Sequence, residues 1–279
     1  SIGIVGVGTI GSAVARGLLS APAAQSSIVL SSRDAEKVAA LKADFPESFQ
    51  VAKDDQDVVD RVDCVILALP GMVAEEIIKS LKFRQGLQVI SLIAAVKLPR
   101  LEQLLGPLVD VGLALPMPAV AKRQGATLGY PPKPFAEAIF STLGTYIAVK
   151  DQEEFLRLES VGGFMGDFYK RQLTIQDWLV SHGVKADTAA SYTGAVFATF
   201  AADSANATGT TFAEKVAEQT PGGLNEMVWK QQAEAGVYTA VNASLDAVYA
   251  RNNKNSSATD DALMNLPSKW YENASVSYV

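Results

Sequence analysis

Residues 1–11, Ser-Ile-Gly-Ile-Val-Gly-Val-Gly-Thr-Ile-Gly, decide the fold of this 279-residue chain. A short apolar run ends in three glycines, Gly6, Gly8 and Gly11, and residues 12–19 continue with small and apolar side chains. This order predicts a strand, a tight turn and the start of a helix. The glycine spacing lets bare backbone approach a pyrophosphate, and the helix N-terminus offers N–H groups and a positive dipole end. An ordinary glycine turn is the alternative, but the strand before it and the helix after it favour nucleotide binding.

Strand-like and helix-like segments alternate through the first half of the chain. We expect strands at residues 27–31, 49–52, 64–69, 88–93, 110–115, 125–130 and 146–149. We expect helices at residues 34–42, 54–61, 72–81, 100–105 and 135–143. Such alternation predicts a parallel sheet covered by helices on both faces.

After residue 150 only helical spacing remains. The expected helices cover residues 151–181, 187–207 with Asp187 as the cap, 210–218, 225–235 and 237–251. The fold class is therefore α/β: a Rossmann-type doubly wound sheet, followed by an all-α domain. The Ala, Ser and Thr content of that domain permits close helix approach, so we expect it to be a dimerisation domain. We predict an NAD(P)-binding domain at residues 1–150, a helical substrate and dimerisation domain at 151–251, and a C-terminal tail at 252–279 that docks through Trp270 and Tyr271.

Composition excludes several functional classes. A net charge of −6 and a pI near 5.0 argue against nucleic-acid binding, because neutralising phosphates requires clustered Lys and Arg. The single cysteine, Cys64, lies in an apolar run and predicts a buried thiol in a reducing compartment. No apolar run reaches the roughly 20 residues that span a bilayer, and no leader precedes the first strand, so we expect a cytoplasmic protein. His182, the only histidine, is expected to end a helix, and we predict no metal site.

The residues after the expected second strand predict which dinucleotide binds. NAD-binding versions of the fold carry an acidic residue about 20 positions past the glycines, where it binds the ribose hydroxyls. Here that position holds Ser31, Ser32 and Arg33. Hydroxyl groups and a guanidinium suit a 2′-phosphate, so we predict NADPH over NADH. A solvated loop arginine is the alternative.

The chain resembles the pyrroline-5-carboxylate reductases from the first strand to about Arg251. The resemblance rests on the glycine loop, on Ser31 to Arg33, and most specifically on Thr220-Pro221-Gly222-Gly223 followed by Glu234-Ala235-Gly236. Further matching segments are residues 65–69, 91–96 and 124–127. The resemblance implies reduction of a cyclic imine carboxylate to proline with NAD(P)H, by a Rossmann domain and a helical domain that forms a homodimer or a larger homo-oligomer.

The resemblance also implies which residues bind each ligand. The cofactor is expected at Gly6, Gly8, Thr9, Ile10, Gly11, Ser31, Ser32, Arg33, Leu69, Pro70, Ala94 and Ala95. The substrate is expected at Thr220, Pro221, Gly222, Gly223 and Leu224. Where the family has two threonines after Pro-Gly-Gly, this chain has Leu224 and Asn225, so its substrate differs or is held differently.

Four residues are candidates for a catalytic role. Asn225 is expected to donate to a carboxylate or ring nitrogen, beside the N–H groups of Gly222 and Gly223, which could hold an anion. The alternative is that this segment only turns between two helices. Lys170 resembles the proton-donating lysine of β-hydroxyacid dehydrogenases and imine reductases. Asp167 and Tyr169 are rival donors, and a solvated helix face is the plainer interpretation.

Two other functions stay open. One is a hydroxyacid dehydrogenase-like or deazaflavin-linked NADP oxidoreductase with the same N-terminal half. The other is an NADP-binding protein without catalysis, which the missing threonines permit.

Overall fold

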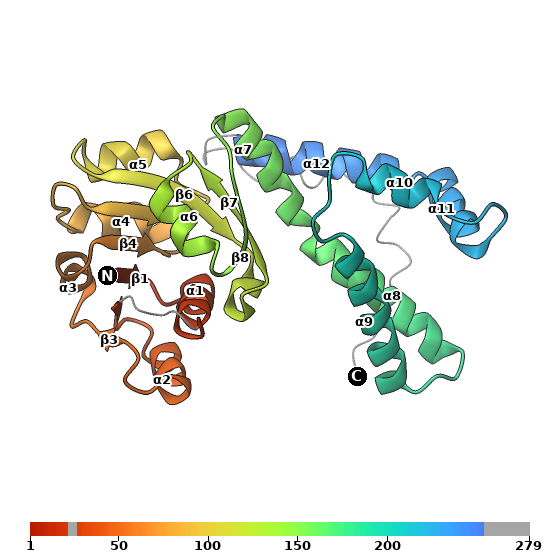
Figure 1. Ribbon diagram of the computed structural model, residues 1–279, viewed down its shortest axis with the longest axis horizontal. Helices are drawn as coiled ribbons and strands as arrows, with labels where there is room; N and C mark the ends of the chain where they lie inside the picture. Colours follow the sequence, from red (N-terminus) through yellow and green to blue (C-terminus); the bar gives the residue numbers. More distant parts are fainter. Residues whose placement is uncertain (22–26, 254–279) are drawn as a thin grey trace. The chain divides into compact units, whose positions relative to one another are not determined.

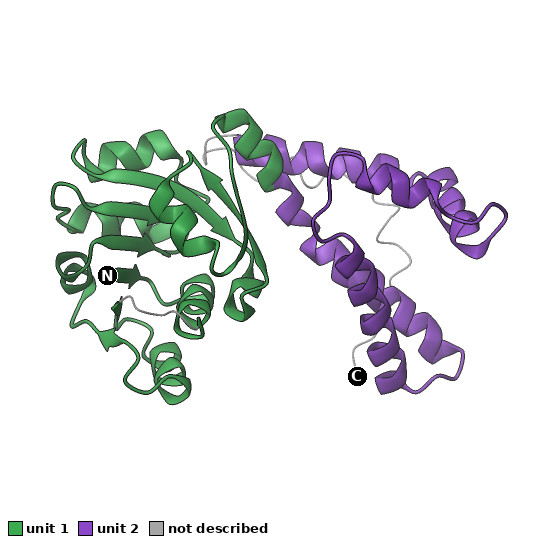
Figure 2. Cartoon of the chain, viewed as in Figure 1, with its two compact units in different colours: residues 1–159, 255–257 green, residues 160–254, 258–279 purple. Residues whose placement is uncertain are grey.

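The computed structural model describes residues 1–21 and 27–253, which form two compact units (Figure 2). The first covers Ser1–Glu159, and the second begins at Ser160. The division falls after Glu159, beyond the border expected after residue 150, because helix α7 (Gln152–Glu159) packs on a strand of the first unit. Most of the predicted tail, with Trp270 and Tyr271, lies outside the described residues.

One eight-stranded sheet forms the centre of the first unit (Figure 1). Its strands, in spatial order, are β3 (Gln50–Val51), β2 (Ile28–Leu30), β1 (Ile2–Val5), β4 (Cys64–Leu67), β5 (Gln88–Ser91), β6 (Asp110–Pro116), β7 (Gly125–Tyr130) and β8 (Gly144–Ala148). The order reverses between β1 and β4, as in a doubly wound sheet.

One pairing departs from the expected parallel sheet. β7 runs antiparallel to β6, whereas β8 runs parallel to β7. The connection between β6 and β7 holds only the short 3₁₀ helix η1 (Pro118–Lys122), which cannot supply the long crossover that a parallel pair needs. The sheet is therefore mixed at this end.

Helices cover both faces because successive strand residues point to opposite sides. Ile2, Ile4 and their neighbours pack in one core with α1 (Thr9–Leu19), α2 (Ala35–Asp44) and α6 (Pro134–Phe140). On the other side, a Cβ at Gly3 would lie 2.5 Å from Val58, which places α3 (Asp55–Arg61) against β1. α4 (Gly71–Ser80) and α5 (Leu98–Leu105) contact each other, and α5 contacts β6.

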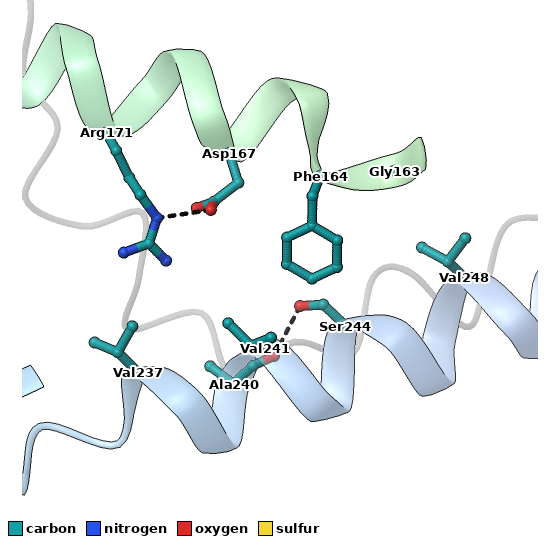
Figure 3. A pocket seen from close by; sticks show the side chains of 9 residues that line it. All are labelled: Gly163, Phe164, Asp167, Arg171, Val237, Ala240, Val241, Ser244 and Val248. Carbon is teal, nitrogen blue, oxygen red and sulfur yellow. Dashed lines mark hydrogen bonds and ion pairs between the residues drawn. The ribbon is translucent and has the colours of Figure 1, made fainter. Parts of the chain in front are cut away.

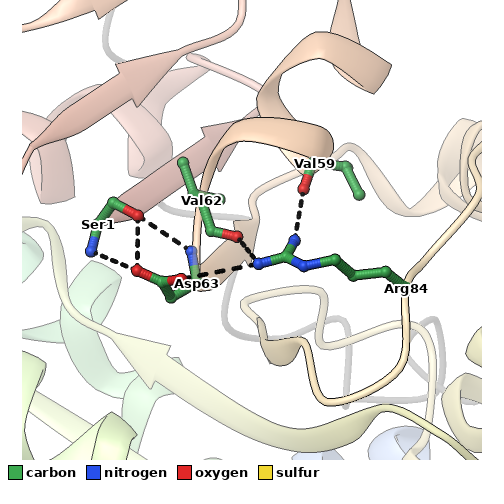
Figure 4. A network of polar contacts seen from close by, with 5 residues as sticks. All are labelled: Ser1, Val59, Val62, Asp63 and Arg84. Atoms are coloured by element: carbon green, nitrogen blue, oxygen red, sulfur yellow. Dashed lines mark hydrogen bonds and ion pairs between the residues drawn. The ribbon is translucent and has the colours of Figure 1, made fainter.

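A polar network joins the amino-terminal ends of the central strands β1 and β4 (Figure 4). The glycine loop follows the opposite, carboxyl-terminal end of β1. The Asp63 carboxylate accepts hydrogen bonds from the Ser1 amino group at 3.0 Å and the Ser1 hydroxyl at 2.8 Å. These bonds hold the pKa of Asp63 below its ordinary value. Arg84 donates to the carbonyl oxygens of Val59 and Val62 at 3.1 and 2.6 Å. It thereby provides donors for carbonyl oxygens that have no intrahelical partner at the end of α3.

The second unit is all helical over its described residues, 160–253, as predicted. It contains η2 (Ser160–Phe164), α8 (Met165–Ser181), α9 (Ala186–Asp203), α10 (Thr211–Ala217), α11 (Leu224–Glu234) and α12 (Val237–Asn253). The expected Asp187 cap is wrong: Lys185 is the cap residue, and Asp187 lies in the first turn, where its charge suits the helix dipole. α9 also ends at Asp203 instead of residue 207. His182 caps the end of α8, as predicted, with Nδ1 2.7 Å from the Trp178 carbonyl oxygen.

Candidate functional site

The glycine loop packs backbone against backbone where β1 passes into α1. Gly6 has φ +93°, and its N–H donates to the Ser31 hydroxyl oxygen at 3.0 Å. A Cβ at Gly6 would lie 2.5 Å from the Ala68 carbonyl oxygen, and a Cβ at Gly11 would lie 2.0 Å from the Gly6 carbonyl oxygen. Side chains at Gly6 and Gly11 are therefore excluded by packing within the chain.

Gly8 is different because it faces open space. No atom lies within 4 Å of a Cβ built at Gly8. Gly8 is the N-cap of α1, followed by Thr9 and Ile10, and no side chain caps the helix. The first turn of α1 holds no acidic residue. The first N–H groups of a helix lack intrahelical acceptors, so this open helix start has the backbone, the dipole and the room that a phosphate needs.

The three residues after β2 have three different surroundings. Ser31 is fully buried, and its hydroxyl is committed to the glycine loop. The Ser32 hydroxyl donates to the Lys53 carbonyl oxygen at 3.3 Å. Arg33 is exposed, and its Nη2 lies 2.8 Å from Oδ2 of Asp55. Only Ser32 and Arg33 thus present groups that an incoming phosphate could engage at the surface.

The loops after β4 and β5 lie side by side. Leu69 is buried, and exposed Pro70 is the N-cap of α4. A Cβ at Gly71 would lie 2.7 Å from Cβ of Ala95, which is exposed like Ala94. A Cβ at Gly11 would likewise lie 3.2 Å from Cβ of Ala68. All the predicted cofactor residues therefore gather at the carboxyl ends of β1, β2, β4 and β5, where the strand order reverses. We call this end of the sheet the cofactor edge.

The predicted substrate turn joins α10 to α11 in the second unit. Gly222 has φ +75°, and its N–H donates to Oε2 of Glu226 at 2.7 Å. The Gly223 N–H donates to the Thr220 carbonyl oxygen at 2.9 Å, and the Leu224 side chain is exposed. Glu226 therefore already occupies the N–H that was expected to hold an anion, and the Lys230 amine 2.7 Å from Oε1 helps to hold the pKa of Glu226 below its ordinary value.

The candidate catalytic side chains of the second unit are exposed. Asn225 Nδ2 donates to Gln219 Oε1 at 2.9 Å. Lys170 and Tyr169 lie on α8, and Tyr169 packs edge-on against Phe168. The Lys170 carbonyl oxygen accepts the Thr174 hydroxyl at 2.9 Å. Neither Lys170 nor Tyr169 lines the cavity that lies between α8 and α12.

A cavity of about 330 Å³ lies between the start of α8 and α12 (Figure 3). The Phe164 ring points toward α12, and Arg171 Nε lies 2.7 Å from Oδ2 of Asp167. The cavity is lined by Gly163, Phe164, Asp167, Arg171, Val237, Ala240, Val241, Ser244 and Val248. Of the candidate proton donors, Asp167 lines it, but its carboxylate is paired with Arg171.

Two further polar residues, Asp55 and Glu159, were not identified from the sequence. Asp55 meets Arg33 only because β3 lies beside β2, and no local spacing signals that pairing. Glu159, the last residue of α7, has a buried Oε2 without a hydrogen-bond partner among the described residues. Burial raises the pKa of Glu159, while the charge of Lys97 opposes that shift.

Cys64 is buried, as predicted, and burial raises the pKa of its thiol to about 12. Within residues 1–21 and 27–253, no cluster of three His, Cys, Asp or Glu residues could hold a metal ion. None of the helices in those ranges is long and apolar enough to cross a membrane.

Residues 1–95 match the family model described as NADP oxidoreductase, coenzyme F420-dependent. That match covers about a third of the chain. No curated protein matches the chain in sequence.

Solved structures match over almost the whole chain. A pyrroline-5-carboxylate reductase from Coxiella burnetii is 21% identical, with a TM-score of 0.77 over 92% of this chain and 98% of that one. The Plasmodium falciparum pyrroline carboxylate reductase with NADP bound is 14% identical, with a TM-score of 0.75 over 90% of this chain and 96% of that one. A reductive aminase from Aspergillus terreus in complex with NADPH4, cyclohexanone and allyl amine is 15% identical, with a TM-score of 0.58 over 95% and 89%. The chain has the fold of the pyrroline-5-carboxylate reductases.

Proposed function

We propose that this chain is an NADPH-dependent reductase that transfers a hydride to the C=N bond of a cyclic imine carboxylate. The substrate is pyrroline-5-carboxylate, which would give proline, or a close analogue. The observation that carries the proposal is the predicted cofactor edge, with its open helix start and the Ser32 and Arg33 pair, in a chain with this fold.

The residues present fit a dinucleotide. The open space at Gly8 admits a pyrophosphate, and the N–H groups of Thr9, Ile10 and Gly11 would receive it. Arg33 would hold the 2′-phosphate, and the Ser32 hydroxyl would donate to it after turning away from the Lys53 carbonyl oxygen. Ser31 would keep the glycine loop in shape through its bond to Gly6. Leu69, Pro70, Ala94 and Ala95 would line the nicotinamide half.

The proposed chemistry requires little of the side chains. When bound, NADPH supplies the hydride, and an iminium carbon is already electrophilic. The chain must bind and orient the imine, exclude water and supply one proton. We assign substrate binding to Thr220, Pro221, Gly222, Gly223 and Leu224, with Asn225 as a donor to the carboxylate or ring nitrogen. Because Glu226 occupies the Gly222 N–H, an anion binds there only if that carboxylate moves away.

We also propose that the second unit forms a homodimer or larger homo-oligomer. Helices α8, α10, α11 and α12 contain no buried residue in the described chain. Exposed side chains on these helices and on α9 include Trp178, Tyr192, Phe200, Phe212 and Met227. An apolar surface of this extent is typical of an interface, so light scattering should give at least twice the chain mass.

One assay separates the proposed reaction from its alternatives. We expect purified protein to oxidise NADPH with pyrroline-5-carboxylate or pyrroline-2-carboxylate. Turnover with hydroxy acids and NADP⁺ instead would indicate the dehydrogenase-like alternative. Binding of NADPH without turnover on any substrate would leave a nucleotide-binding protein. We propose a role in proline biosynthesis only for turnover with pyrroline-5-carboxylate. The proposed cytoplasmic location is tested separately by cell fractionation.

The match of residues 1–95 to a deazaflavin-linked family favours a second candidate. In that reaction hydride passes between NADP(H) and a deazaflavin. The same protein preparation should then reduce a deazaflavin with NADPH and ignore both pyrrolines. Both proposed reactions use the cofactor edge, and they differ in which substrate the second unit would bind.

The proton donor can be tested with matched exposed residues. If Lys170 supplies the proton, Lys170→Ala lowers kcat at least tenfold, whereas Lys185→Ala, an exposed lysine of the same unit, leaves it unchanged. Tyr169→Phe is paired in the same way with Tyr192→Phe. Full activity in both Lys170→Ala and Tyr169→Phe would assign the proton to Asp167, to another acidic group or to water, because the Asn225 amide donates hydrogen bonds but is not an acid.

A further inference from the structure

Arg33, the predicted phosphate-binding residue, already has an anionic partner. Its Nη2 lies 2.8 Å from Oδ2 of Asp55, a single charge-assisted bond. The Asp55 side chain is 12% exposed, whereas the Arg33 side chain is 62% exposed. The carboxylate is therefore the fixed member of the pair and the guanidinium the movable one.

Asp55 reaches Arg33 through the topology of the sheet. β3 pairs in parallel with β2, and the Ala52 N–H donates to the Leu30 carbonyl oxygen at 2.9 Å. The Ser32 hydroxyl bonds the Lys53 carbonyl oxygen, so the loop after β3 is tied to the loop after β2. Asp55 is the first residue of α3. The Asp55 carboxylate, which follows β3, therefore lies where NAD-binding versions of the fold have a carboxylate at the end of β2.

A carboxylate at this place affects the two dinucleotides in opposite ways. A 2′-phosphate carries almost two negative charges and requires the guanidinium that Asp55 neutralises. A ribose 2′-hydroxyl carries no charge and is a donor that a carboxylate accepts. Binding NADPH therefore requires Arg33 to weaken its bond to Asp55 or brings two anions to one guanidinium, whereas binding NADH requires neither.

We propose that Asp55 is a specificity-determining residue that competes with the 2′-phosphate for Arg33 and so limits the preference for NADPH. This inference rests on the proposed function, because it concerns the cofactor of the same site. It assigns to Asp55 a role in discrimination between cofactors and none in hydride or proton transfer.

The test is the dissociation constant for NADH divided by that for NADPH, measured by calorimetry on the full chain. Asp55→Asn keeps the shape and removes the charge, and we expect the ratio to rise about three- to tenfold, mainly through tighter NADPH binding. Asp54→Asn is the matched control. It removes the same charge one residue earlier, where the carboxylate caps α3 by accepting the Asp57 N–H at 2.8 Å. Asparagine also caps helices, so this ratio should change less than twofold.

A double-mutant cycle assigns the effect to the pair. In the Arg33→Ala background, Asp55→Asn should change the ratio less than twofold, because the contested guanidinium is gone. Binding of 2′,5′-ADP against 5′-AMP repeats the comparison with fragments that differ in the 2′-phosphate.

Three results would overturn the inference. An unchanged ratio in Asp55→Asn means that Arg33 leaves Asp55 without cost. A lower ratio means that Asp55 holds Arg33 in place for the phosphate. If the wild-type chain binds neither NADPH nor 2′,5′-ADP, the proposed cofactor fails as well, and this outcome is distinct from the other two.

Discussion

Replacing Gly11 with alanine should destabilise the protein, because the new methyl group would clash with the backbone of the glycine loop. A Cβ at Gly11 would lie 2.0 Å from the Gly6 carbonyl oxygen, and ordinary contact begins at 3.4 Å. The Ala68 Cβ lies 3.2 Å from the same point. The helix must therefore move away from the glycine loop by more than about 1 Å, in an interior that is closely packed.

The magnitude follows from two opposing effects. Overpacking costs about 1–3 kcal/mol, and the upper part of that range applies because the clash is with backbone. Alanine gains about 1 kcal/mol over glycine in a helix interior. We expect a net loss of about 2 kcal/mol in the free energy of unfolding, and a melting temperature lower by about 4–8 °C.

Gly8→Ala is the matched control because it separates folding from binding. Gly8 has φ −71°, which alanine adopts, and its Cβ would meet no atom within 4 Å. We expect a stability change within about 0.5 kcal/mol, since the weaker N-cap is offset by a less flexible unfolded chain. The methyl group fills the space proposed for the pyrophosphate, so NADPH binding should weaken at least tenfold, about 1.4 kcal/mol.

The assay is thermal and urea unfolding of both variants without ligand, followed by NADPH titration. The expected pattern is Gly11→Ala destabilised and Gly8→Ala stable but impaired in binding. An unchanged melting temperature for Gly11→Ala would refute the packing argument. Unimpaired NADPH binding by Gly8→Ala would refute the placement of the pyrophosphate.

Three further predictions concern the first unit. Glu159→Gln should stabilise the protein at neutral pH. Because the pKa of the Glu159 carboxyl is raised in the folded state, the folded protein loses stability as the pH rises above the ordinary value of 4.5. Urea midpoints should therefore fall less steeply from acidic to neutral pH in the variant than in the wild type, and parallel curves would contradict this. Arg84→Ala should lower the free energy of unfolding in urea by about 1–2 kcal/mol, because two carbonyl oxygens at the end of α3 lose their donor. The control Lys82→Ala changes an exposed lysine and should lower it by less than about 0.5 kcal/mol. Cys64 should react with a thiol reagent only as fast as the protein opens, because its thiol is buried with a pKa of about 12, and rapid reaction of the native protein would show that this strand is accessible.

Local pattern was enough to predict most of the elements. Residues 1–11 carry the strand, the turn and the helix start within one stretch, and the structure has β1, Gly6 with positive φ, and α1 at those places. The change from alternating elements to helices near residue 150 was equally visible, because apolar spacing differs between strands and helices. The direction of β7 was not, because strand direction depends on how the chain returns after a short connection.

The candidate site divides in the same way. Sequence spacing was sufficient to predict the glycine loop and Ser31 to Arg33, because each depends on residues close together in the chain. The pairing of Arg33 with Asp55 joins residues of two different elements, and side-chain spacing does not predict it. The burial of the Glu159 carboxyl depends on tertiary packing and is likewise not predicted by spacing. The hydrogen bond from the Gly222 N–H to Glu226 is local and resembles helix capping. The sequence did not predict it, because it depends on the backbone conformation of the turn. The glycine loop is thus a property of the sequence, whereas the charges that would discriminate between its ligands are set by which strands lie side by side.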